Sequence, residues 1–138
     1  MDDFRQIISY DELTSEGTTT LARIAAEAIR GLNRATNCDA GLDQPPVACD
    51  ILSSLAAAAS RLPQALTQIT SYLTRAAAAG QLGHDLGQDP ATCVEAAAIF
   101  PGDAAASAAA LAGDLDAAQQ QLALINGTPA RRTPQDQS

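Results

Sequence analysis

Apolar residues recur every three or four positions from Thr18 onward, the spacing of one buried helix face. The first such stripe comprises Leu21, Ile24, Ala25, Ala28, Ile29 and Leu32. We expect Thr14, Ser15 or one of Thr18 to Thr20 to cap this helix. The turn-forming residues 37–41 are expected to end it.

A second helix is predicted by a heptad stripe in which spacings of three and four alternate without error. Its members are Leu52, Leu55, Ala59, Leu62, Leu66, Ile69 and Leu73. Pro45 and Pro46 suit the first turn of this helix, where a missing N–H costs nothing. Positions beside the stripe carry no charge, which indicates a stripe wide enough to face two neighbours in a bundle.

The third helix follows a loop over residues 80–89 that contains three glycines. Asp89 and Pro90 are expected to serve as its N-cap and first residue. Its stripe again alternates spacings of three and four: Val94, Ala97, Pro101, Ala104, Ala108, Leu111, Leu115, Ala118, Leu122 and Ile125. Asn126 and Gly127 are expected to stop it.

These patterns predict an all-α fold, an antiparallel helical bundle of three main helices. Residues 1–17 are expected to form an N-terminal arm or a short fourth helix. Kinks are expected at Pro63 and Pro101, with a full break and restart at residues 101–103 as an alternative for the latter. Residues 1–127 are expected to form a single domain, and residues 128–138 a disordered tail.

Composition narrows the class of protein. The 138 residues are 46% hydrophobic but only 3% aromatic, with runs of alanine that favour helix. All eight basic residues are arginine, which suggests a GC-rich bacterial genome. The net charge of −8 argues against binding to nucleic acid or to anionic membranes. Without a signal-peptide pattern or an uncharged membrane-spanning stretch, a cytoplasmic location is expected, with the cysteines as thiols.

No constellation of residues predicts catalysis. His84, the only histidine, lies beside Asp85 in the glycine-rich loop, where a rigidly oriented base is not expected. It nominally completes a zinc site with Cys38, Cys49 and Cys93, but these lack a C-x2-C pair. Cys38 and Cys49 could pair as a disulfide in an oxidising compartment. We therefore expect no enzyme activity, cofactor or metal, and keep His84 and Asp85 as a candidate loop site.

Charged residues divide along the chain. Arg61 and Arg75 lie two heptads apart, hence on one helix face, whereas residues 76–130 contain acids and no basic residue. One interpretation is ordinary surface pairing or solvation. The other is a bipolar protein in which Asp103, Asp114 and Asp116 help to dock a basic partner.

Three segments carry a resemblance: residues 21–33 (LARIAAEAIRGLN), 60–66 (SRLPQAL) and 80–87 (GQLGHDLG). They resemble a family of alanine-rich helical proteins of high-GC bacteria that has no assigned activity. The likeness covers most of residues 10–126. It implies a helical fold and an association with plasmid-like or conjugative elements, and it brings no functional residues.

A non-enzymatic interaction or accessory module is the function favoured by these observations, with a protein partner or a homodimer. Small helical-hairpin proteins of type VII secretion share the architecture, so a secreted protein of that kind is an alternative. Their Trp-x-Gly turn is missing here, because the sequence contains no tryptophan. A thiol- or metal-dependent sensor is the third hypothesis.

Overall fold

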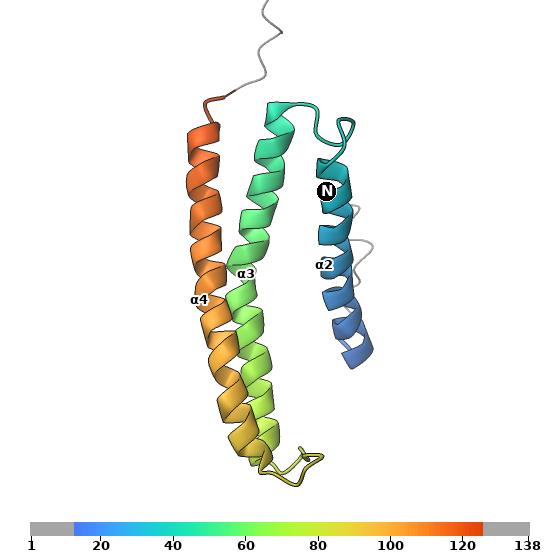
Figure 1. The fold of residues 1–138 in the computed structure, drawn as a ribbon, viewed down its shortest axis with the longest axis vertical. Helices are drawn as coiled ribbons and strands as arrows, with labels where there is room; N and C mark the ends of the chain where they lie inside the picture. The colour runs from blue at the N-terminus through green and yellow to red at the C-terminus, as the bar shows by residue number, and fades with distance from the viewer. Residues whose placement is uncertain (1–12, 126–138) are drawn as a thin grey trace, which may run out of the picture. The chain divides into compact units, whose positions relative to one another are not determined.

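Three α-helices make up the regular structure of residues 13–125, the part of the chain that this computed structural model describes. They are α2 (Ser15–Thr36), α3 (Pro45–Ala78) and α4 (Pro90–Leu122). The chain divides into two units, residues 1–43 with α2 and residues 44–138 with α3 and α4 (Figure 1).

The predicted all-α fold with three main helices is confirmed over this range. A single domain over residues 1–127 stays a prediction, as do the kinks at Pro63 and Pro101. The expectations for residues 1–12 of the N-terminal arm, for the stop at Asn126 and Gly127, and for the C-terminal tail lie outside the described residues.

Thr14 caps α2, one of the positions expected to do so. Its hydroxyl accepts a hydrogen bond from the Gly17 N–H at 3.0 Å, which satisfies one of the free donors at the helix start. The helix ends at Thr36, beside the predicted stop. No residue of α2 is buried, and its apolar stripe, with Leu21, Ile24 and Ile29, stays partly exposed.

Two prolines in its first turn begin α3, as expected, and a glycine motif ends it. Gly80 has a positive φ of 71° and its N–H donates to the Ala77 carbonyl at 3.1 Å. The Gln81 N–H donates to the Ala76 carbonyl at 3.0 Å. This pair of bonds is the Schellman motif, which satisfies carbonyls left free at a helix end and favours glycine because of the left-handed φ.

Asp89 caps α4, as the sequence predicts. Its carboxylate accepts from the Ala91 N–H at 3.1 Å and from the Thr92 hydroxyl at 3.2 Å.

Two expectations about α4 are wrong. Residues 101–103 do not break the helix, because α4 continues unbroken through Pro101. It then ends at Leu122, so Ile125 lies beyond the helix, where its N–H closes a turn onto the Leu122 carbonyl.

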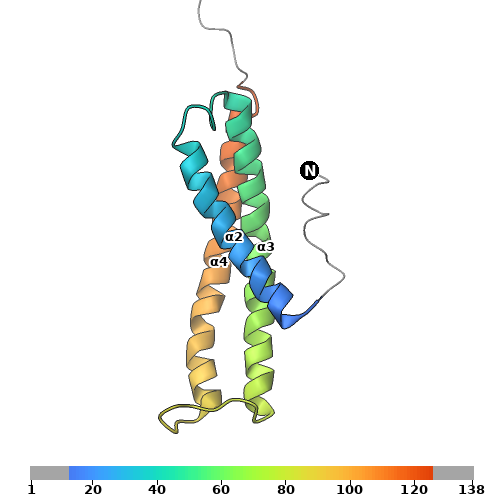
Figure 2. The same cartoon turned by 90° about the vertical axis from the view of Figure 1, so that its right-hand side faces the viewer.

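Helices α3 and α4 lie side by side and antiparallel, joined by the loop over residues 79–89 (Figures 1 and 2). Leu52, Ala59 and Leu66 face α4 as predicted, and so do Val94, Pro101, Ala108, Leu115 and Leu122 on α4. The buried residues among those described are all alanines: Ala56, Ala59, Ala76, Ala108 and Ala112.

Each predicted stripe alternates between two sets of positions, and one set is correct. The second set was predicted one residue too early over most of its length. On α3, Ala56 is buried and Pro63 and Thr70 are partly buried, whereas Leu62 and Ile69 are exposed. Leu55 is partly buried, like Leu52 and Leu66. On α4 the inward positions are Ala98, Ala105 and Ala112, whereas Ala97, Ala104 and Leu111 are exposed. Small side chains therefore occupy these contact positions, and their larger neighbours one residue away face outward.

Candidate interaction surface

The one-residue shift places large apolar side chains on one side of the α3–α4 pair. Successive residues of a helix are about 100° apart, so Leu62 and Ile69 lie beside the contact stripe of α3 and Leu111 beside that of α4. Because the helices run in opposite directions, positions with the same offset from the stripe lie on the same side of the pair.

We call this side the apolar flank. It comprises Leu55, Leu62, Ile69 and Tyr72 of α3 and Ala97, Phe100, Ala104 and Leu111 of α4. Ile69 and Tyr72 are each 57% exposed and Phe100 is 73% exposed. Large apolar side chains gathered on one exposed face are common at sites where a protein associates with another molecule.

The opposite side of the pair is polar. On α3 it carries Ser53, Ser60, Thr67 and Ser71, and on α4 it carries Glu95 and Asp116. The exception on this side is Ile99, which is 63% exposed. The hairpin is therefore amphipathic as a unit, with one side that is mostly polar and one side that is mostly apolar.

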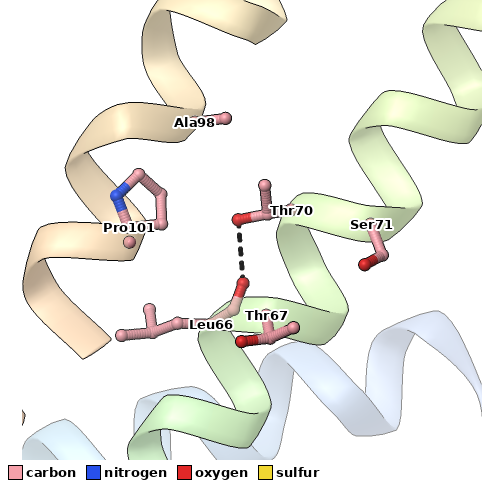
Figure 3. A pocket seen from close by; sticks show the side chains of 7 residues that line it. Leu66, Thr67, Thr70, Ser71, Ala98 and Pro101 are labelled. Carbon is pink, nitrogen blue, oxygen red and sulfur yellow. Dashed lines mark hydrogen bonds between the residues drawn. The ribbon is translucent and has the colours of Figure 1, made fainter. Parts of the chain in front are cut away.

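Two shallow hollows lie on either side of the contact between Thr70 and Pro101. The Thr70 hydroxyl donates to the Leu66 carbonyl of its own helix at 2.9 Å (Figure 3). A hollow of about 150 Å³ opens towards the polar side, where Thr67, Ser71 and Gly102 line it. A second hollow of about 260 Å³ opens towards the apolar flank.

That second hollow is lined almost entirely by apolar groups. Its lining residues are Thr70, Leu73, Cys93, Val94, Ala97, Ala98 and Pro101. It arises because alanine, threonine and proline meet where larger side chains would fill the space. Phe100 lies one helical turn from Ala97 on the same flank, so an exposed aromatic ring and an apolar hollow are neighbours.

The charged residues singled out in the sequence are not brought together. Arg61 and Arg75 lie on the face of α3 turned away from α4, and Asp103 on the corresponding outer face of α4. Asp114 borders the apolar flank, whereas Asp116 lies on the polar side. All five are exposed. Within the described residues the salt bridge is Arg30–Glu27 on α2, at 3.7 Å.

The loop candidates form a local turn. The Nδ1 atom of His84 accepts a hydrogen bond from the Leu86 N–H at 3.0 Å. The backbone carbonyl of His84 accepts a second one from the Gly87 N–H. Asp85 is exposed. His84 thus orders the loop through its backbone neighbours.

The three cysteines are free thiols. Cys38 is exposed, while Cys49 and Cys93 are partly buried and their sulfur atoms lie 3.8 Å from the Leu122 carbonyl and the Gln88 side-chain oxygen. No group of three His, Cys, Asp or Glu side chains within residues 13–125 is placed to hold a metal ion.

Of the helices described, α4 alone is long and apolar enough to cross a membrane by length and composition. Its acids, Glu95, Asp103, Asp114 and Asp116, interrupt that apolar character.

Phe100 was not predicted as a surface residue from the sequence. The sequence did carry a signal for it: a lone phenylalanine off the heptad stripe in a helix otherwise rich in alanine.

Comparison with known proteins adds no relative, because no family profile, curated protein or solved structure matches the chain.

Proposed function

We propose that this protein is a non-enzymatic helical interaction module that binds another protein through its apolar flank. The observation that supports this most strongly is the exposure of Ile69, Tyr72 and Phe100 on one side of an otherwise well-formed helical pair. Such side chains lose unfavourable contact with water when a partner helix covers them.

The contact between α3 and α4 leaves Ile69, Tyr72 and Phe100 exposed. Its buried positions are alanines, which hide little apolar area each, so the larger side chains remain available for a partner. Helix-on-helix association is the recognition mode that fits an apolar stripe bounded by polar residues.

A photo-crosslinking amino acid at position 100 tests this proposal in cells that produce the protein. The matched control carries the same group at Gln64, an exposed position of α3 outside the apolar flank. We expect protein adducts from position 100 and few from position 64. The proposal is wrong if position 100 gives no protein adduct, or no more than position 64.

A further inference from the structure

We infer that the partner covering the apolar flank is a second copy of this chain, an inference that rests on the proposed function. Two hairpins would pack flank to flank about a two-fold axis, so that four helices enclose the apolar side chains. The juxtaposition that carries the inference is an exposed aromatic ring beside an apolar hollow of suitable size on one face.

Self-complementarity is the first argument. A two-fold contact uses the same patch on both copies, so a patch must contain both a projection and a recess. Phe100, 73% exposed, is the projection, and the hollow of about 260 Å³ between Leu73, Cys93 and Ala97 is the recess. A two-fold axis near the hollow would bring the Phe100 ring of each copy towards the recess of the other.

Charge is the second argument. A chain with a net charge of −8 repels its own copies, most strongly where acids would face acids. The apolar flank has Asp114 as its bordering charge, whereas the polar side and outer faces carry Glu95, Asp103 and Asp116 on α4. Contact through the apolar flank therefore brings fewer acids of α4 together than contact through its polar side or outer face would.

Light scattering of the purified full-length protein over a dilution series tests the inference. We expect the mass to rise from one to two chains with concentration. Phe100→Gln should raise the dissociation constant by at least about tenfold while the helix content stays unchanged. The control is Ile99→Gln, because Ile99 is the neighbouring residue, is 63% exposed and points to the other side of α4.

Several results would overturn the inference. These are a monomer at every concentration, an equal effect of both substitutions, or a large fall in the Tm of the dilute monomer for Phe100→Gln, which would mean that the flank is covered within one chain. Sedimentation with phosphatidylcholine vesicles that depends on Phe100 would assign the flank to a membrane. A monomer whose position 100 still crosslinks to a different protein would refute only the second copy and leave the proposed function standing.

Discussion

Ala112 and Leu111 are neighbours in α4, yet the smaller residue lies in the contact with α3 and the larger one faces outward. Ala112 is 7% exposed and Leu111 is 49% exposed. This arrangement reverses the usual preference for large apolar residues in the interior. It places alanine in the contact between the two helices, and it supplies the exposed surface on which the proposed function depends.

Enlarging the smaller residue, Ala112, should therefore destabilise the protein more than truncating the larger one, Leu111. Ala112→Leu places three extra carbon atoms in a tight contact and should lower the free energy of unfolding by about 1–3 kcal/mol. Leu111→Ala should cost less than about 1 kcal/mol in the dilute monomer, because the side chain is half exposed there. Urea unfolding at low protein concentration measures both. A larger loss for Leu111→Ala would contradict the assigned contact stripe.

Removing the cap of α4 should weaken the hairpin. Asp89→Ala deletes an acceptor for the Ala91 N–H and the Thr92 hydroxyl, and should cost about 0.5–2 kcal/mol of stability. Asp85→Ala is the control, because it removes the same charge from an exposed position of the same loop. Thermal unfolding of the two variants should differ in Tm, and equal Tm values would exclude the capping role.

The interhelical loop contains a matched pair of glycines. Gly87 has φ of +73°, a region that disfavours a side chain, whereas Gly83 has no positive φ and open space around its Cα. Gly87→Ala should destabilise the protein by about 1 kcal/mol. Gly83→Ala should be neutral or slightly stabilising, because it restricts only the unfolded chain. Chemical denaturation of both variants would reveal any reversal of this order.

The thiols should differ in accessibility. Cys38 is exposed, so it should react with a disulfide reagent before Cys49 and Cys93, which are partly buried. Mass spectrometry of the labelled peptides over time gives the order directly. Preferential labelling of Cys93 would point to an activated thiol and revive the sensor hypothesis.

The sequence was sufficient to predict the helices and their starts, because caps and periodicity act locally. Thr14 and Asp89 are caps that a short-range pattern identifies. The contact stripe was only half predictable: with alanine at so many positions, two registers one residue apart satisfy the same spacing. The heptad pattern favours Leu62 and Ile69, but tertiary packing favours Pro63 and Thr70.

The candidate surface was missed for the same reason. A large apolar residue in a heptad pattern is assigned to the core, which places Ile69 and Leu111 inside, although both are exposed. The charged candidates Arg61 and Asp103 lie on opposite outer faces, a relationship that depends on how the two helices pair and not on spacing within either one.

The most direct test of the account is hydroxyl-radical footprinting of Tyr72 and Phe100 at low and high protein concentration. Both rings are exposed on the apolar flank, and Leu86 in the interhelical loop, 81% exposed, serves as the internal reference. We predict that both rings are oxidised readily in dilute protein and become protected at high concentration, while Leu86 does not change. Protection of Tyr72 and Phe100 already in the dilute monomer would contradict an exposed interaction surface.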